Sequence, residues 1–201
     1  MIVFHLFWNL DSFGYLDLDM KDQFWKFCRN VIVSMFLITV GISLALANTS
    51  SINWSKIGKR TLILAGASLL VSIGSYTQFP NSWIYFGILH FILVASLVGL
   101  LFLNRPVISF LTAIVIFLGT WQGWLHTRWL FDMFDGFLPS YTVDLARFFP
   151  WFGVVLIGMV IFHYGLHNKF FKVKKLSFLG RHSLLIYMIH QPILFGLLYI
   201  I

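Results

Sequence analysis

Residues 83–103 read WIYFGILHFILVASLVGLLFL, a run with no Asp, Glu, Lys or Arg and with a single histidine, His90. A helix that crosses a hydrocarbon core about 30 Å thick needs about 20 predominantly apolar residues. This run is therefore predicted to be a membrane-spanning helix. Five further apolar runs of similar length are predicted to span as well, at residues 30–48, 61–77, 106–125, 148–166 and 178–201.

The first ten residues, MIVFHLFWNL, are equally apolar, but as a helix they extend only about 15 Å, about half of a bilayer core. We interpret residues 1–10 as a partial span whose beginning is missing. The fold class predicted for residues 1–201 is all-α, a single polytopic membrane bundle of about seven transmembrane helices with the first one truncated.

The composition excludes an ordinary soluble domain. Of the 201 residues, 59% are hydrophobic and 10% are charged, whereas roughly a quarter of the positions in a soluble domain are charged. A pI near 9.7 can indicate nucleic-acid binding, but in so apolar a chain it favours basic loops on the cytoplasmic side of a membrane, and no nucleic-acid partner is expected. The single cysteine, Cys28, excludes an intramolecular disulfide and a thiolate zinc cluster, and no metal is expected.

Charge placement predicts the orientation of the bundle. One set of alternate loops holds nine basic residues and no acid, namely Lys56, Lys59, Arg60, Arg105, Lys169, Lys172, Lys174, Lys175 and Arg181. The other set holds five basic residues, Lys21, Lys26, Arg29, Arg128 and Arg147, together with all seven Asp. Because basic residues accumulate in cytoplasmic loops, the N-terminus is predicted to lie inside and the C-terminus outside.

Three histidines lie inside predicted spans, between the outer interface and the midplane: His5, His90 and His190. An ionisable side chain at membrane depth indicates a functional site, while a neutral imidazole bonded to a neighbouring helix is the competing interpretation. On the last span Ser183, Tyr187 and His190 are spaced i, i+4 and i+7, so they share one helix face. Arg181 and His182 stand at the inner end of that polar stripe.

Two outer segments are candidates for recognition. The stretch DLDMKDQFWKFCR at residues 17–29 is predicted to be an amphipathic surface helix that places Arg29 at the lipid boundary. The long segment at residues 126–147 mixes aromatic, acidic, Gly and Pro positions, as recognition loops do, and ends close to Asp144 and Trp151. Arg29, Asp144 and Trp151 are our candidates for acceptor binding.

Five segments in this order resemble a known family: FHLFWNLDSFGY at residues 4–15, FWKFCRNVIVSMFLITVGISLAL at 24–46, FGILHFI at 86–92, TVDLARFFPWFGVVLIGM at 142–159 and FLGRHSLLIYMIHQPIL at 178–194. They are similar to the bacterial relatives of heparan-alpha-glucosaminide N-acetyltransferase, within the transmembrane acyltransferases that include the acyltransferase-3 group. The segment GRHSLLIYMIHQPIL is the most distinctive of the five.

The resemblance implies a membrane acyltransferase of the bacterial inner membrane. It would move an acetyl or other acyl group from cytoplasmic acyl-CoA, typically acetyl-CoA, to a hydroxyl or amine of a glycan or lipid-linked sugar on the outer side. His5 matches the catalytic histidine candidate of the first helix and would act as a general base or as an acyl-carrying nucleophile. Asn9 and Asp11 would orient it or the acceptor, and His90 and His190 would contribute to the transfer step.

For the donor, a cationic inner mouth suits the phosphates of CoA and a polar stripe suits its pantetheine arm. Arg181, His182, Ser183 and Tyr187 are therefore the expected donor-binding residues. Acceptor identity, acyl chain length and oligomeric state stay open, a homo-oligomer included.

Two other function classes remain as alternatives. Paired histidines at similar depth are also the requirement of a bis-histidine haem protein that carries electrons. A small transporter or scaffold without acyl chemistry would use the histidines as a proton relay.

Members of the family begin with a basic, Arg-Gly-containing segment that opens a full first span, whereas this sequence starts inside that span. We therefore expect an in-frame upstream extension of roughly 15 to 30 residues, enough to complete a span and a basic cap.

Overall fold

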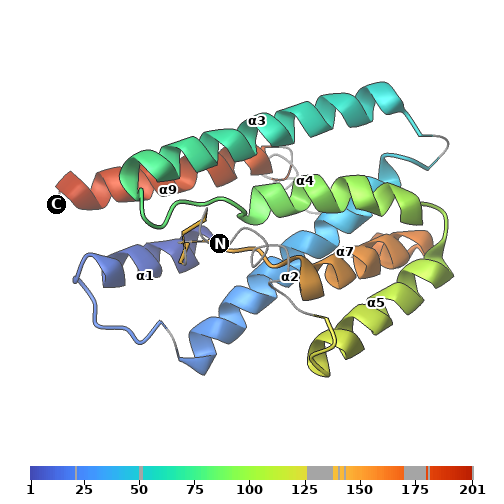
Figure 1. The fold of residues 1–201 in the computed structure, drawn as a ribbon, viewed down its shortest axis with the longest axis horizontal. Coiled ribbons are helices and arrows are strands. Elements are labelled where there is room, and N and C mark those ends of the chain that lie inside the picture. Colours follow the sequence, from blue (N-terminus) through green and yellow to red (C-terminus); the bar gives the residue numbers. More distant parts are fainter. Residues whose placement is uncertain are drawn as a thin grey trace. The chain divides into compact units, whose positions relative to one another are not determined.

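The computed structural model describes residues 1–20, 22–49, 52–125, 138–139, 141–142, 144–169, 180 and 182–200. Within this part the chain forms seven α-helices and two short 3₁₀-helices (Figure 1). They are α1 (Ile2–Ser12), α2 (Gln23–Leu46), α3 (Trp54–Gln78), α4 (Ile88–Gly99), η1 (Leu100–Phe102), α5 (Pro106–Trp121), α7 (Phe148–His163), η2 (Leu166–Lys169) and α9 (Ser183–Ile200).

Three of these helices are long and apolar enough to cross a membrane: α2 with 24 residues, α3 with 25 and α9 with 18. The stretch formed by α4 and η1, and the helices α5 and α7, are apolar but shorter. The helical structure and the apolar character of its helices confirm the predicted all-α fold of a membrane protein. The number of spans and their orientation stay predictions.

Two helices begin earlier than their apolar runs indicated. Helix α2 begins at Gln23 and continues without interruption to Leu46, so the second half of the surface helix predicted at residues 17–29 is helical and leads directly into the apolar run. No Pro or Gly interrupts the sequence there, and nothing ends the helix between its polar and apolar parts. The first half of the predicted surface helix is wrong, because residues 17–20 and 22 are not helical. Helix α3 begins at Trp54 because the Asn53 side chain caps it, accepting a hydrogen bond from the Lys56 N–H at 3.0 Å.

Helix α4 begins later than predicted, at Ile88 instead of residue 83. The preceding backbone is held by serines of α3 instead of by helical bonds. The Ile84 N–H donates to Ser75 Oγ at 2.9 Å, and the Ile84 carbonyl accepts from Ser72 Oγ at 2.7 Å. A hydropathy pattern counts residues 83–87 with the span, whereas these side-chain bonds exclude them from the helix.

The chain divides into two compact units, and the boundary falls within α2. We call Met1–Met35 with Phe170–Ile201 the terminal unit, and Phe36–Lys169 the central unit. The terminal unit contains α1, the first half of α2, and α9. The central unit contains the second half of α2 together with α3, α4, α5 and α7.

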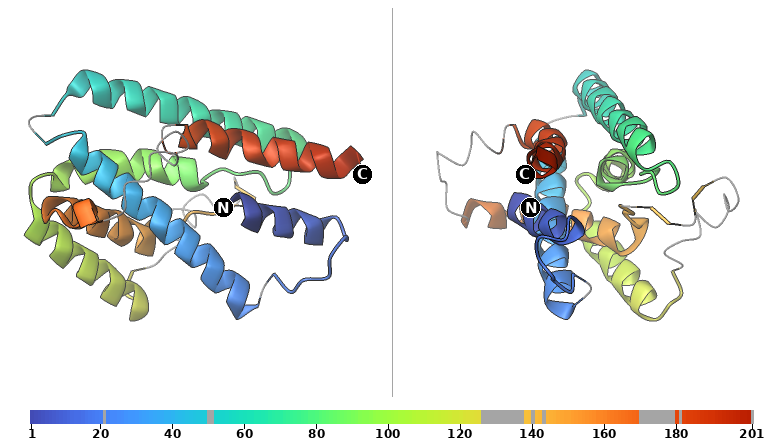
Figure 2. Two further views of the ribbon diagram at one scale, coloured as in Figure 1. Left: turned by 180° about the vertical axis from the view of Figure 1, so that it is seen from behind. Right: turned by 90° about the vertical axis from the view of Figure 1, so that its left-hand side faces the viewer.

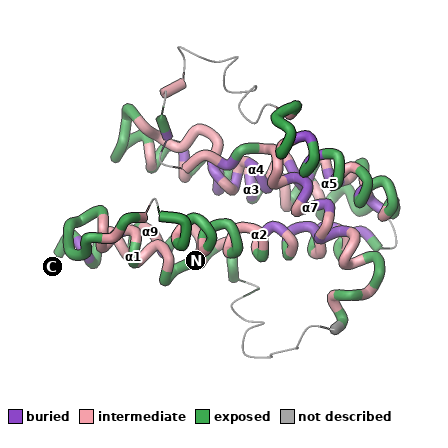
Figure 3. Tube along the Cα trace, turned by 90° about the horizontal axis from the view of Figure 1, so that it is seen from below, coloured by how far each residue is buried: buried purple, intermediate pink, exposed green. Residues whose placement is uncertain are grey.

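In the central unit α5 packs against α7 and α3 packs against α4 (Figure 2). Buried residues gather on α4, α7 and the second half of α2 (Figure 3). Helices α2 and α7 cross at two glycines, because a Cβ atom at Gly41 would meet the backbone of Val155 and one at Gly158 would meet the backbone of Ile38. This crossing requires the absence of a side chain at both positions.

In the terminal unit α1 packs along α9 (Figure 1). The rings of Phe13 and Phe195 join one end of this pair, with centroids 5.7 Å apart. The rings of Phe4 and Phe7 contact Trp25 of α2 at 5.9 and 5.6 Å. These aromatic contacts hold α1 between its two neighbours and so place the polar residues of α1 against α9.

Candidate active site

The terminal unit brings together two histidines from the two ends of the chain. The rings of His5 on α1 and His190 on α9 contact each other with centroids 5.0 Å apart and planes inclined by 56°. His190 is only 8% exposed. Two of the three histidines found in apolar runs of the sequence therefore meet at one place.

Two amide side chains lie at the same helix contact. Asn9 is one turn along α1 from His5 and is fully buried. Its Oδ1 atom accepts a hydrogen bond from Nε2 of Gln191 at 3.4 Å. Asn9 Nδ2 and Gln191 Oε1 are buried and have no hydrogen-bond partner among the described residues. We call His5, Asn9, His190 and Gln191 the histidine–amide cluster.

The cluster is unusual because buried polar atoms normally have a hydrogen-bond partner. An amide-to-amide bond uses one NH₂ group and one carbonyl oxygen. Whichever way the two amides are turned, one NH₂ donor and one oxygen acceptor therefore remain at Asn9 and Gln191. A third buried atom, His190 Nε2, also has no partner among the described residues. Together these atoms leave one donor and two acceptor positions unused among the described residues.

Sequence reasoning left Gln191 out of the candidate site residues. Its position next to His190 was a weak signal, because neighbouring residues on a helix point in different directions. The bond to Asn9 from the other end of the chain is what makes it part of the cluster.

Other predicted residues of the terminal unit have the following positions. Tyr187 is half-buried, and its backbone carbonyl lies 2.6 Å from Nδ1 of His190. Ser183 and His182 are exposed, and Arg181 lies outside the described residues. The Asp11 side chain accepts a hydrogen bond from the Leu18 N–H at 2.8 Å and so holds the segment that follows α1 against the end of that helix. Arg29 on α2 is exposed.

His90 belongs to the central unit, where both of its ring nitrogens have partners. Nδ1 accepts from the Gly87 N–H at 3.3 Å, so in the neutral ring the proton is on Nε2. Nε2 donates to Ser72 Oγ at 3.1 Å, and Ser72 Oγ donates to the Ile84 carbonyl at 2.7 Å. These successive hydrogen bonds join α3 to the start of α4.

The two remaining predicted residues also belong to the central unit. Asp144 Oδ2 accepts from the Ile88 N–H at 3.3 Å, so this carboxylate caps the first turn of α4. Thr142 Oγ1 donates to the Trp83 carbonyl at 2.8 Å. Thr142 and Asp144 therefore hold their part of the chain against residues 83–88. Trp151 is half-buried on α7.

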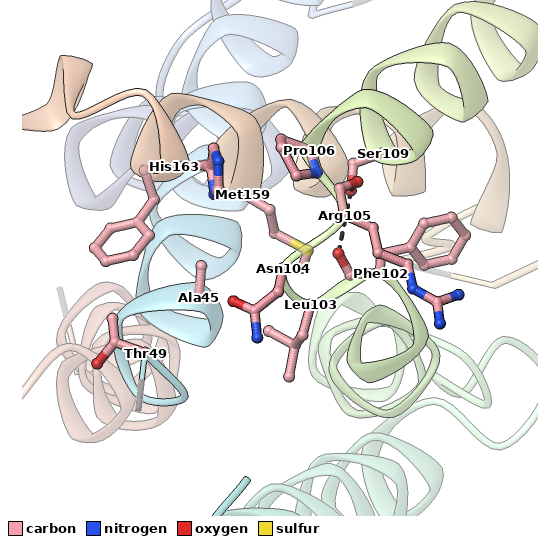
Figure 4. A pocket seen from close by; sticks show the side chains of 11 residues that line it. Ala45, Thr49, Phe102, Leu103, Asn104, Arg105, Pro106, Ser109, Met159 and His163 are labelled. Atoms are coloured by element: carbon pink, nitrogen blue, oxygen red, sulfur yellow. Dashed lines mark hydrogen bonds between the residues drawn. The ribbon is translucent and has the colours of Figure 1, made fainter. Parts of the chain in front are cut away.

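The central unit also has a pocket of about 260 Å³ where the ends of α2 and α7 meet the start of α5 (Figure 4). Leu103, Ser109 and Met159 form its buried floor. The Arg105 guanidinium points away from His163, which stands on the other side of the pocket (Figure 4). The lining therefore does not gather charge at one point, unlike a site for a phosphate group.

Among the described residues, no three His, Cys, Asp or Glu side chains lie close enough together to hold a metal ion. The ring contact between His5 and His190 also bears on the haem alternative. Two axial histidines must stand on opposite faces of a macrocycle, whereas these two rings touch each other directly.

In the comparison with protein families, the model described as heparan-alpha-glucosaminide N-acetyltransferase, catalytic, matches residues 1–192. The matched region includes both helices that form the histidine–amide cluster. Comparisons with curated proteins and with solved structures gave no match.

Proposed function

Because the chain belongs to the heparan-alpha-glucosaminide N-acetyltransferase catalytic-domain family, we propose that it is a membrane acetyltransferase whose reaction centre is the histidine–amide cluster. It takes the acetyl group from acetyl-CoA supplied on the cytoplasmic side and transfers it to a hydroxyl or amine of a glycan or lipid-linked sugar on the outer side. The membrane is the inner membrane of a bacterium.

The observation that carries this proposal is the direct contact of His5 with His190 beside two amides that each keep an unused polar atom. Acetyl transfer needs a base for the acceptor and a donor for the negative charge that develops on the carbonyl oxygen. Imidazole nitrogens supply the first, and the NH₂ group of Asn9 supplies the second. His5 acts either as a base or as the nucleophile that carries the acetyl group.

The other predicted residues have supporting roles in this proposal. Arg181, His182, Ser183 and Tyr187 bind the donor, and Arg29, Asp144 and Trp151 contribute to acceptor binding. His90 has a packing role, because both of its nitrogens already have partners within the central unit.

The direct test uses protein purified into lipid nanodiscs with radiolabelled acetyl-CoA and a panel of neutral, amino and lipid-linked sugars. We expect acetylated sugar and equimolar free CoA from the wild type. His5→Ala should lose at least about 100-fold in kcat, the usual contribution of an acid–base or nucleophilic residue. Tyr199→Phe is the matched control, because Tyr199 lies at the end of α9 and is 86% exposed.

Unchanged activity in His5→Ala would refute the role given to His5. The same preparation also separates the two alternative functions. A haem protein would show a Soret absorption band, and a transporter would move solute across vesicles without any acyl donor. Either result in the absence of acetyl transfer would contradict the proposal.

A further inference from the structure

The hydrogen bond at Nδ1 of His190 determines which of its two nitrogens carries a proton. Nδ1 lies 2.6 Å from the backbone carbonyl oxygen of Tyr187, one turn earlier in α9. A carbonyl oxygen only accepts hydrogen bonds, so Nδ1 must be the donor. In the neutral imidazole Nε2 then carries a lone pair and no proton.

That lone pair is at the buried side of the ring. His190 is 8% exposed, and Nε2 has no partner among the described residues. The His190 ring contacts the ring of His5 on α1, and Gln191, the next residue on α9, bonds to Asn9 of α1. His90 shows the opposite arrangement, since its Nδ1 is an acceptor and its Nε2 is used by Ser72. Of these two histidines, only His190 therefore keeps a free basic nitrogen.

We propose that His190 is the general base that removes the proton from the acceptor sugar, with the Tyr187 backbone carbonyl as the group that orients it. This inference rests on the proposed acetyltransferase function and assigns the base role that the sequence had given to His5. An oriented base, held by a second group through its other nitrogen, is the arrangement that general-base catalysis requires.

The proton and the electron pairs balance in both routes to the product. In direct transfer, Nε2 takes the hydroxyl proton while the acceptor oxygen bonds to the thioester carbon. The carbon–sulfur bond then breaks, and the proton passes from Nε2 to the departing sulfur, so that CoA leaves as a thiol. If His5 carries the acetyl group, the unprotonated His5 nitrogen first bonds to the thioester carbon, the carbon–sulfur bond breaks, and the proton on the other His5 nitrogen passes to the sulfur, so that CoA leaves as a thiol. In the second step Nε2 of His190 takes the hydroxyl proton while the acceptor oxygen bonds to the acetyl carbon. The bond from that carbon to His5 breaks, and the proton passes from Nε2 to His5, which becomes neutral imidazole again. In both routes His190 ends as neutral imidazole.

The experiment compares His190→Gln, His190→Ala and Tyr199→Phe in nanodiscs. Glutamine keeps a polar amide at this position but cannot take up a proton. We expect kcat to fall at least about 100-fold in both His190 variants, with the Kd for acetyl-CoA unchanged. The fall of kcat/KM at acidic pH in the wild type should be lost from the residual activity of His190→Gln. The control should keep the wild-type rate and pH profile.

A second measurement does not depend on activity. Wild-type protein labelled with ¹⁵N-histidine should show one ring, absent from the His190→Gln spectrum, that is protonated at Nδ1 and not at Nε2. A proton on Nε2 instead would overturn the assignment. Wild-type kcat and pH profile in His190→Gln would also overturn it while leaving the acetyltransferase function standing. A wild-type protein that neither binds acetyl-CoA nor transfers acetyl would overturn both.

Discussion

The side-chain oxygen of Asn9 accepts a hydrogen bond from the amide nitrogen of Gln191 across 3.4 Å, and this bond joins the first helix to the last one described. The NH₂ group of Asn9, one helical turn along α1 from His5, is buried and has no hydrogen-bond partner among the described residues. The first prediction follows from that NH₂ group.

Asn9→Ala should lower kcat by about 100-fold, because removal of one donor to a developing oxyanion costs about that much. It should also lower the free energy of unfolding by about 1–3 kcal/mol, since Gln191 loses its buried partner. Acetyl transfer assays and thermal unfolding in nanodiscs measure the two effects. Asn30→Ala is the control, because Asn30 is exposed on α2. A rate equal to that of the wild type would exclude Asn9 from oxyanion stabilisation.

His90→Ala should affect stability more than catalysis. The change leaves the Gly87 N–H without its acceptor and removes one of the two partners of Ser72 Oγ, which keeps its bond to the Ile84 carbonyl. We expect a loss of about 1–3 kcal/mol in unfolding free energy and less than a tenfold change in kcat for the folded protein. His190→Gln is measured in the same assay, so that the losses of activity in the two variants can be compared. If His90→Ala lost as much activity as His190→Gln while keeping its Tm, the packing role of His90 would be wrong.

Gly158→Leu should destabilise the central unit strongly, because a side chain there would meet the backbone of Ile38 and force α2 and α7 apart. Overpacking of this kind costs about 1–3 kcal/mol or more. Gly66→Ala is a matched control in α3, where a Cβ atom meets nothing within 4 Å. Alanine favours a helix over glycine by about 1 kcal/mol, so this variant should be at least as stable as the wild type. Equal unfolding temperatures for Gly158→Leu and the wild type would contradict a tight helix crossing.

The charge pattern predicts which loops face the cytoplasm. In a Cys28→Ser background, Asn81→Cys should react with a membrane-impermeant maleimide on intact cells, because it lies in a predicted outer loop. Asn104→Cys, next to Arg105, should react only after permeabilisation. Gel shifts of the labelled protein measure both reactions. Reversed labelling would mean that the predicted orientation is inverted.

Much of the fold could be predicted from local sequence. Apolar runs such as residues 83–103 exceed the length needed to cross a bilayer, and the helices found there are apolar in character. The helix ends were less predictable, because they depend on single bonds. The Asn53 cap starts α3 before charged residues that a hydropathy pattern excludes from the helix. Hydrogen bonds to the serines of α3 keep residues 83–87 out of α4.

The sequence by itself determined that this is an apolar helical protein, that its charged residues fall between apolar runs in two unequal sets, and that three histidines lie within those apolar runs. These properties are local, because they depend on composition and on spacing along one helix. Only the tertiary structure decided that His5 meets His190, that Asn9 meets Gln191 and that His90 bonds within the central unit. Helical spacing defines the face on which a residue lies, but the partner of that face comes from packing between segments far apart in the chain.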